Sequence, residues 1–293
     1  MKISECAELY LSYIADKSEN TVKNYRSDLK QFIEIVGDKD VETVAKPDIA
    51  KFRMVLQSKR KKSSTIARKL ACINSFFEYL MDLELVNSSP ITKSHRPKIS
   101  QKIPSALSNQ EVQRVLKSAR TLQEKTILIV MLTTGLRSSE LLGIKRRNLI
   151  LYREDRTYGI EHLLETGLKE NDIVYIRVLG KGDKEREVPI VGKPLEIFYN
   201  YLQSHNFEEV FPISYHMLRR KIIDIGKRAA VDLHPHKLRH TAATLALQSG
   251  AELRVIQELL GHASPLTTAR YAKVGQKQLL SATKSLSESI LSE

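Results

Sequence analysis

Residues 234–272 read HPHKLRHTAATLALQSGAELRVIQELLGHASPLTTARYA, and this stretch decides the fold that we expect. Pro235 is expected to open a helix, because its fixed φ suits the first turn. His236 and Arg239 stand three residues apart and so share one face of that helix. An imidazole and a guanidinium on one face can converge on a phosphate, since the planar guanidinium donates to two phosphate oxygens together. Taken alone, the pair is better explained as a surface His-Arg pair.

The second half of this stretch holds a glycine, a histidine and a tyrosine. Gly261 is expected to end a helix as its C-cap, and His262 follows it directly. Tyr271 comes nine residues after His262. The sequence contains eleven tyrosines, and a lone tyrosine in a helix more often packs in a core than acts as a nucleophile. Residue type alone therefore does not select Tyr271.

Two more cations precede this stretch. Arg137 lies in LTTGLRSSEL, residues 132–141, where Glu140 is expected to close the turn as its ion-pair partner. Lys181 lies between two glycines at the tip of a predicted hairpin, whose strands, 173–178 and 187–191, alternate apolar and polar residues. Flexible flanks would let its ammonium reach a departing oxygen, although a solvated turn lysine is the plainer explanation.

The order and spacing of these blocks decide between the alternatives. Arginine, lysine, His-x-x-Arg, Leu-Gly-His and tyrosine follow one another, and together they resemble the tyrosine recombinases, which are phage-integrase-like enzymes, close to their Xer type. The resemblance is densest over residues 234–272 and extends weakly over the N-terminal part. It implies that the catalytic residues are Arg137, Lys181, His236, Arg239, His262 and the nucleophile Tyr271.

The chemistry of these side chains fits that role. A tyrosine hydroxyl has a pKa near 10, so nearby cations are needed to favour the phenolate. Arg137 and Arg239 would stabilise the charge that attack builds on the phosphate, with hydrogen bonds from His236 and His262. Lys181 would protonate the leaving 5′ oxygen. The implied 3′-phosphotyrosyl link keeps bond energy for rejoining, so no ATP, metal ion or other cofactor is expected.

The helical patterning and the resemblance together predict a two-domain fold, mainly α with a small antiparallel sheet. Residues 1–87 are expected to form a helical, SAM-like core-binding domain of about four helices. Residues 88–104 are expected to form a basic linker broken by prolines. Residues 105–293 are expected to form an α+β catalytic domain with a C-terminal helix.

Two basic segments are candidates for DNA contact. The first is a turn between helices and the second is in the linker, and their residues are Lys59, Arg60, Lys61, Lys62, Arg96 and Lys98. Viewed alone, the first run is explained at least as well as a solvated loop.

Two further segments leave alternatives open. Residues 152–171 exceed what a minimal Xer-type protein would carry, and they either extend the hairpin or form a loop that contacts DNA or a neighbouring subunit. In the tail after Gly275, four apolar residues fall on one helical face, namely Leu279, Ala282, Leu286 and Ile290. That face either packs on its own domain or, as the resemblance implies, exchanges with a neighbouring protomer.

The composition points to a polyanionic partner. The formal net charge is +13, and a chain this basic usually meets nucleic acid, with an anionic membrane surface as the second candidate. Residues 1–16 lack the apolar core of a signal peptide, and the longest apolar run, 127–132, is far too short to span a bilayer. The two distant cysteines form no zinc spacing or disulfide framework. We therefore expect a cytoplasmic, nucleoid-associated protein with no membrane partner.

Three classes of function remain. The favoured class is a site-specific recombinase on double-stranded DNA, with a dimer on each site and a tetramer in the synapse, or with a paralogous recombinase as partner. Its expected role is Xer-like resolution of chromosome or plasmid dimers, with an integrase or excisionase of a mobile element as the alternative. A type IB topoisomerase-like enzyme is disfavoured by the compact N-terminal helical part. A non-catalytic DNA-binding protein is least favoured, because every catalytic position holds the expected residue type.

Overall fold

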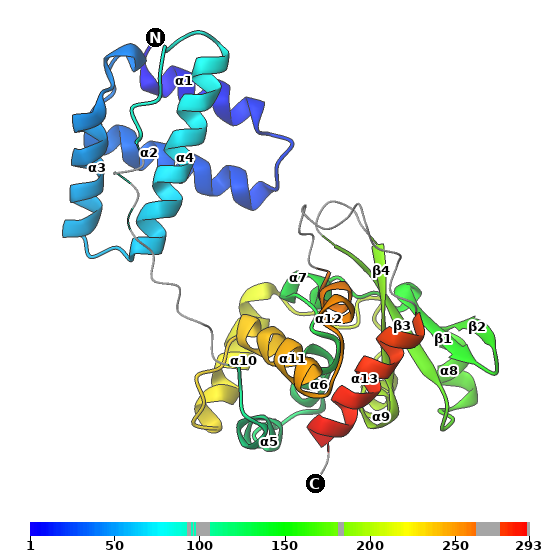
Figure 1. Ribbon diagram of the computed structural model, residues 1–293. Helices are drawn as coiled ribbons and strands as arrows, with labels where there is room; N and C mark the ends of the chain where they lie inside the picture. The colour runs from blue at the N-terminus through cyan, green and yellow to red at the C-terminus, as the bar shows by residue number, and fades with distance from the viewer. Residues whose placement is uncertain (93–94, 96, 98–105, 181–184, 262–275, 292–293) are drawn as a thin grey trace. The chain divides into compact units, whose positions relative to one another are not determined.

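The computed structural model describes residues 1–92, 95, 97, 106–180, 185–261 and 276–291. Contacts between Cα atoms divide the chain into two units, Met1–Lys102 and Ile103–Glu293. The described residues are mostly helical, with one small antiparallel sheet in the second unit (Figure 1). The predicted fold class is confirmed. Most of the predicted linker lies outside the described residues, so the predicted domain bounds stay a prediction.

The N-terminal unit contains, in its described part, four α-helices and a short 3-10 turn around one apolar core: α1 (Ile3–Tyr13), α2 (Glu19–Val36), η1 (Val41–Thr43), α3 (Lys46–Ser58) and α4 (Ser63–Asp82). The Ser18 hydroxyl caps α2 by accepting the backbone N–H of Thr21 at 3.3 Å, which suits a serine at this position. Pro47 lies in the first turn of α3. A capping serine and an early proline therefore mark the starts of these two helices.

A buried carboxylate joins α2 to α4. Asp28 is 1% exposed, and it accepts a hydrogen bond from the Lys69 ammonium at 2.6 Å and bonds from the Arg68 guanidinium. A buried charge is tolerated when it is paired and hydrogen-bonded. This cluster therefore fixes how the two long helices pack.

The C-terminal unit combines helices with the sheet. Its described elements are α5 (Asn109–Lys117), α6 (Leu122–Thr134), α7 (Ser138–Leu142), η3 (Arg146–Asn148), β1 (Leu149–Arg153), β2 (Arg156–Gly159), α8 (Ile160–Thr166), β3 (Ile173–Leu179), β4 (Glu185–Val191), α9 (Gly192–Gln203), α10 (Tyr215–Arg228), α11 (Pro235–Gln248), α12 (Leu253–Leu260) and α13 (Gln276–Leu291). The strands follow the order β2-β1-β3-β4, with every neighbouring pair antiparallel. The predicted hairpin is confirmed, because β3 and β4 pair from Ile173↔Val191 to Leu179↔Glu185.

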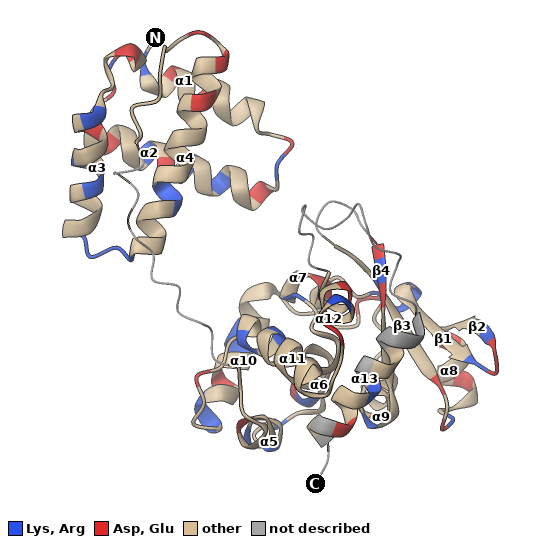
Figure 2. Ribbon diagram, in the orientation of Figure 1, with Lys and Arg blue, Asp and Glu red and all other residues tan. Residues whose placement is uncertain are grey.

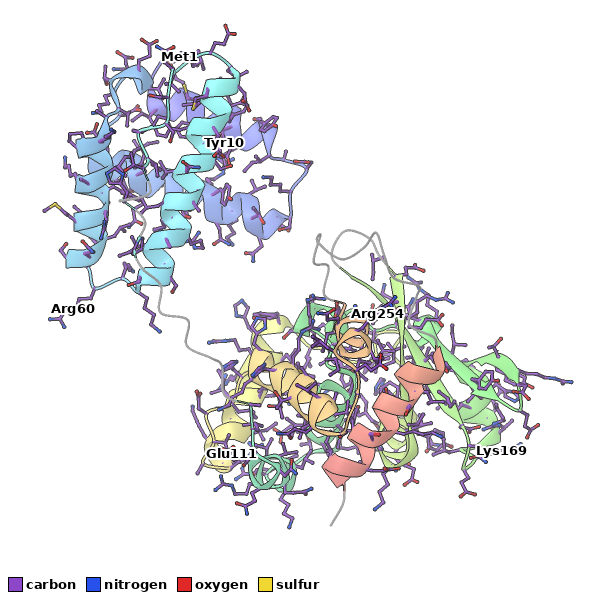
Figure 3. All side chains as sticks on the ribbon, viewed as in Figure 1. Met1, Tyr10, Arg60, Glu111, Lys169 and Arg254 are labelled. Carbon is purple, nitrogen blue, oxygen red and sulfur yellow. The ribbon has the colours of Figure 1, made fainter. Side chains whose placement is uncertain are left out.

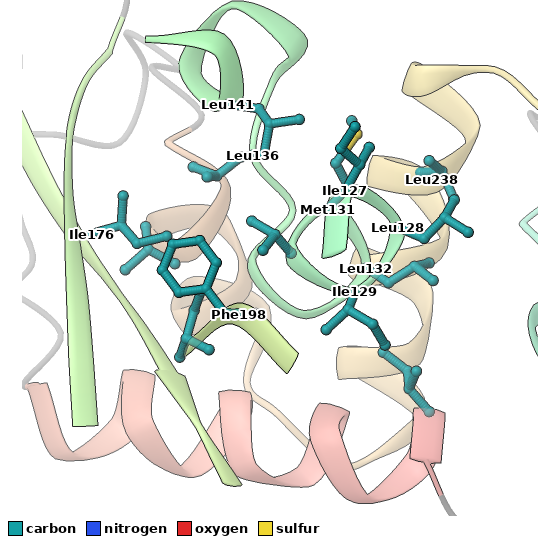
Figure 4. Packing of buried hydrophobic residues seen from close by; sticks show 14 of the residues in the cluster. Ile127, Leu128, Ile129, Met131, Leu132, Leu136, Leu141, Ile176, Phe198 and Leu238 are labelled. Carbon is teal, nitrogen blue, oxygen red and sulfur yellow. The ribbon is translucent and has the colours of Figure 1, made fainter. Parts of the chain in front are cut away.

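Helix α6 forms the centre of this unit. Every residue from Thr126 to Thr134 is buried, which is typical of a helix surrounded by other elements. It contacts α9, α11, α13 and β4. Figure 4 shows Phe198 and Ile176 on one side of the α6 side chains and Leu238 on the other. Because α6 is held on all sides, the turn that follows it is fixed in place.

The last helix, α13, packs on its own unit. It contacts β4, α11, α6 and α12, and Leu286 and Ile290 are both 0% exposed within the core. The structure describes the backbone of Leu279 and Ala282 but not their side chains. The tail could pack on its own domain or exchange with a neighbouring protomer, and in this single chain it packs on its own domain.

Residues 152–171 do not extend the β3–β4 hairpin. They complete a separate hairpin, in which β2 pairs with β1, and then form α8. Arg153 fixes this segment: its Nε donates to Asp172 Oδ1 at 2.7 Å and its Nη2 donates to the Gly167 carbonyl oxygen at 2.7 Å. The segment therefore adds an edge strand and a helix to the sheet.

Candidate active site

A glycine turn places Arg137. Helix α6 ends at Thr134, and Gly135 follows with φ +62°, a conformation that favours glycine. A Cβ at Gly135 would lie 2.3 Å from Leu260 Cδ2, so α12 approaches the turn closely. Arg137 then precedes α7, and its backbone N–H donates to Glu140 Oε2 at 2.7 Å. The predicted Arg137–Glu140 pair is confirmed, with Arg137 Nη1 2.8 Å from Glu140 Oε1.

Three arginines meet the C-terminal end of α12. Arg186 Nε donates to the carbonyl oxygen of Leu259 at 3.2 Å, Arg239 Nη2 to that of Leu260 at 2.6 Å, and Arg137 Nη2 to that of Gly261 at 3.0 Å. The last carbonyls of a helix lack partners within the helix, and cations are favourable there. The guanidinium groups come from α11, β4 and the α6–α7 turn, and the end of α12 brings them together.

Glu140 lies among these three cations. Its side chain is 4% exposed and accepts bonds from Arg186 Nη1 and Nη2, both at 2.9 Å, and from Arg137 Nη1. Arg239 Nη1 lies 3.9 Å from Glu140 Oε2. Burial raises the pKa of Glu140, but hydrogen bonds from Arg186 and from the Arg137 backbone outweigh it and lower the pKa to about 2. Three guanidinium groups and one carboxylate leave a net charge of +2.

The two predicted catalytic arginines differ in exposure. The Arg137 side chain is 31% exposed, whereas that of Arg239 is 9% exposed. Burial and the neighbouring Arg137 lower the pKa of Arg239 to about 10, which leaves it protonated at neutral pH. Arg137 is therefore the more accessible of the two to an anion.

His236 lies in the first turn of α11, three residues before Arg239 as the sequence predicts. His234 caps this helix, since its Nδ1 accepts the backbone N–H of Lys237 at 3.1 Å. His236 is exposed. It lines a cavity of about 480 Å³ together with His234 at the start of α11 and with one face of α10, which carries Tyr215, Arg219, Ile223 and Lys227. This hollow gives His236 access from solvent.

Lys181, His262 and Tyr271 lie outside the described residues, so the structure does not place them. Their described neighbours are Leu179 and Glu185, where β3 ends and β4 begins, and Gly261, the C-cap of α12. Gly261 has φ +63°, which agrees with the predicted C-cap glycine. His262 thus directly follows the residue whose carbonyl accepts the bond from Arg137.

The DNA-contact candidates divide in the same way. Lys59, Arg60, Lys61 and Lys62 are all exposed, and Figure 2 shows the loop between α3 and α4 in the colour of Lys and Arg. Figure 3 shows the Arg60 side chain extending away from the N-terminal unit. Arg96 and Lys98 lie outside the described residues. The role of all six residues stays a prediction.

The sequence interpretation missed Arg186. It follows the predicted hairpin tip, and it shares a strand face with Val188 and Ile190, which are both 0% exposed. Because strand side chains alternate between faces, an arginine on the same face as two core residues is a signal of a buried, paired cation. That signal was present in the sequence.

Within the residues that the structure describes, no group of three or more His, Cys, Asp and Glu side chains could hold a metal ion. No helix in the same part of the chain is long and apolar enough to cross a bilayer.

Comparisons with known proteins identify the family. The phage integrase family matches residues 105–278, and the N-terminal SAM-like domain of phage integrases matches residues 7–83. A tyrosine recombinase of Thermosipho africanus is 30% identical over 305 residues, covering 97% of this chain and 99% of the relative. Tyrosine recombinase XerC of Staphylococcus aureus is 32% identical over 283 residues, covering 89% and 88%.

A solved structure agrees with the fold. The lambda integrase fragment 75–356, crystallised as a dimer bound to a COC′ core site, superposes with a TM-score of 0.69 at 16% identity, over 94% of this chain and 100% of that chain. The match to the phage integrase family over residues 105–278 alone covers more than half of the chain. The chain therefore belongs to the phage integrase family and is a tyrosine-type site-specific DNA recombinase.

Proposed function

We propose that this recombinase cuts and rejoins DNA through a 3′-phosphotyrosyl intermediate, with Tyr271 as the nucleophile. The observation that carries the proposal is the convergence of Arg137 and Arg239 on the end of α12, directly before His262. A phosphate seated over this end would meet a net positive charge and the N–H groups of two guanidiniums.

The arginines bind the scissile phosphate. Each guanidinium carries five N–H donors, and the hydrogen bonds among the described residues use only some of those on Arg137 and Arg239. Arg137, the more exposed of the pair, contacts a non-bridging oxygen, and Arg239 supports it from α11. His236 and His262 add hydrogen bonds to the same oxygens. Removing one such donor costs on the order of 10²–10³ in rate.

Strand cleavage and rejoining conserve the number of phosphodiester bonds, so the proposed reaction needs no cofactor. The Tyr271 hydroxyl gives its proton to a neighbouring base, and its oxygen bonds to phosphorus while the bond from phosphorus to the 5′ oxygen breaks. Lys181 supplies the proton to that oxygen. A 5′ hydroxyl from another strand then gives its proton to Lys181 and attacks the phosphotyrosine, and the tyrosine leaves with its bond electrons and regains its proton from the base. One phosphodiester is broken and one is made.

The partners follow from the charge and from the relatives. Double-stranded DNA carrying a specific site suits the net charge of +13. Lambda integrase forms a dimer on a core site and a tetramer on a Holliday junction, which supports a dimer on each site and a tetramer in the synapse, formed with a second copy or a paralogue. An enzyme with this substrate would act in the cytoplasm at the nucleoid.

The proposed biological role is Xer-like resolution of chromosome or plasmid dimers. The support is the XerC relative, which matches 89% of this chain. Integration or excision of a mobile element is the second candidate, because lambda integrase shares the fold. Mapping of the bound DNA across a host genome separates them, because integration requires a site on the mobile element itself, whereas dimer resolution requires only copies of one site on the replicon that is resolved.

A nicked suicide substrate tests the chemistry. We expect wild-type protein to form a covalent protein–DNA adduct and Tyr271→Phe to form none. Tyr199→Phe is the matched control, because Tyr199 lies on α9 and its hydroxyl accepts a hydrogen bond from the exposed Gln203 at 2.7 Å. An adduct of undiminished yield in Tyr271→Phe would contradict the proposal. Exchange between two sites, and not relaxation alone, distinguishes a recombinase from a topoisomerase-like enzyme.

A further inference from the structure

We propose that Arg186 is a positioning residue for strand cleavage, which holds Arg137 and the end of α12 in place while Arg137 contacts the phosphate. The inference rests on the proposed function, because it concerns the same site. Arg186 is the second residue of β4, and its side chain is 12% exposed, against 31% for Arg137. It is therefore less available to DNA than Arg137.

The guanidinium of Arg186 joins two elements at once. Its Nη1 and Nη2 donate to the two carboxylate oxygens of Glu140 at 2.9 Å each, and its Nε donates to the Leu259 carbonyl oxygen at 3.2 Å. A planar fork makes such a bidentate contact and keeps a third donor for another acceptor. A lysine ammonium has no such geometry. The three bonds tie β4 to α7 and to the last turn of α12.

Arg186 also packs against the residue that precedes His262. A Cβ at Gly261 would lie 2.8 Å from Arg186 Nη1 and 2.9 Å from its Cζ. The guanidinium therefore occupies the space where a side chain at position 261 would be. The Gly261 carbonyl accepts the bond from Arg137 Nη2 at 3.0 Å. Arg186 thus touches both partners of Arg137, namely Glu140 and Gly261.

Loss of Arg186 would release Glu140. Two charge-assisted bonds to the carboxylate would disappear, and its oxygens would turn toward Arg137 Nη1, already at 2.8 Å, and Arg239 Nη1, at 3.9 Å. The carboxylate would then compete with the phosphate for those two cations. The expected defect is therefore in the rate of cleavage within the bound complex, with DNA affinity near that of wild type.

A purely structural ion pair is the alternative explanation. Removal of one partner from a buried ion pair destabilises a fold whether or not the pair also positions Arg137, so a melting temperature cannot decide between the two roles. The cleavage rate of folded, DNA-saturated protein can decide between the two roles. A structural role predicts that this rate is unchanged.

The experiment is single-turnover cleavage of a nicked suicide substrate at saturating DNA, with DNA affinity and thermal unfolding measured alongside. For Arg186→Met we expect a loss of about 10–100-fold in rate, the usual size of an outer-shell effect. Arg186→Lys keeps the charge but not the fork, so its rate should lie near that of Arg186→Met. Arg186→Lys also tests the inference if Arg186→Met fails to fold.

The matched control is Arg177→Met. Arg177 lies on β3 of the same hairpin, its side chain is 45% exposed, and its Nη2 pairs with Glu187 at 3.1 Å. Its loss should leave the rate at the wild-type value. In addition, Arg137→Lys with Arg186→Met should cleave no more slowly than Arg137→Lys alone, because residues that act through one another are not additive.

A second substrate separates Arg186 from Lys181. When sulfur replaces the leaving 5′ oxygen, departure no longer depends on a proton donor, and we expect the ratio of wild-type to Arg186→Met rates to be unchanged. Recovery of the variant on this substrate would assign its defect to the Lys181 hairpin and overturn the inference. A wild-type rate in either Arg186 variant, or additivity in the double variant, would also overturn it. If wild-type protein forms no adduct, the proposed function fails first and this inference fails with it.

Discussion

Arg239 caps the C-terminal ends of two helices with one guanidinium. Its Nη1 donates to the Gly135 carbonyl oxygen after α6, and its Nη2 donates to the Leu260 carbonyl oxygen of α12, both at 2.6 Å. Both carbonyls lie where helices lack internal partners. The position of this cation is therefore set by the close approach of α12 to the turn after α6, before any DNA is bound.

Arg239→Lys should lose both the cap and the phosphate contact. A single ammonium cannot span the two carbonyls that the fork joins, so we expect cleavage to fall by about 10²–10³-fold and the protein to melt at a lower temperature. Single-turnover cleavage and thermal unfolding measure the two effects. Arg220→Lys is the control, because the Arg220 side chain on α10 is 86% exposed. Cleavage within threefold (about 0.65 kcal/mol) of wild type in Arg239→Lys would be incompatible with this role.

Glu140 should contribute to the pH dependence of stability. Burial raises its pKa, but the bonds from Arg186 and Arg137 outweigh burial and lower the pKa from 4.5 to about 2. Because the folded-state pKa is the lower one, this stabilisation is complete above about pH 4.5 and is lost as the pH falls toward about 2. The difference corresponds to about 3 kcal/mol of unfolding free energy.

Urea unfolding across this pH range tests that contribution. The fall in unfolding free energy on acidification should be smaller in Glu140→Gln than in wild type. Glu154→Gln should follow the wild-type curve, because the Glu154 side chain is 74% exposed and pairs with Lys169 at the surface. Parallel curves for wild type and Glu140→Gln would refute the expectation.

Local sequence patterns predicted the parts of the site that are local in the chain. His236 and Arg239 needed only a helix opened by Pro235, and the β3–β4 hairpin needed only alternation around a glycine-flanked tip. The Arg137–Glu140 pair spans one turn. In each case the interacting residues are close in sequence, so helical or strand periodicity is enough.

The rest depends on packing between distant segments. Arg137 and Gly261 are 124 residues apart, and Arg186 and Leu259 are 73 apart, so no periodicity reveals that α12 gathers three arginines. Residues 152–171 were also undecided, because the Arg153–Asp172 contact that fixes them joins the end of β1 to the approach to β3. Arg186 alone carried a usable signal, through its place on the core face of β4.

Gly261→Ala should disturb the arginine cluster without removing any charge. Its new Cβ would lie 2.8 Å from Arg186 Nη1, and φ at this position is +63°. Gly250→Ala is the matched control, because Gly250 has φ +85° and no heavy atom of the described residues lies within 4 Å of the Cβ position. Both variants should lose about 1–2 kcal/mol of stability through backbone strain. Only Gly261→Ala should also lose cleavage rate, and equal rates in the two would contradict the expectation.

Leu286→Ala tests where α13 packs. Leu286 is 0% exposed in the core of its own domain, so its truncation should cost about 2–5 kcal/mol of unfolding free energy. If α13 packs on its own chain when DNA is absent, this loss is the same at every protein concentration, because no second chain takes part in unfolding. Ser281→Ala is the control, since Ser281 is exposed on the same helix. A loss that changes with protein concentration would instead show that α13 packs on a neighbouring protomer.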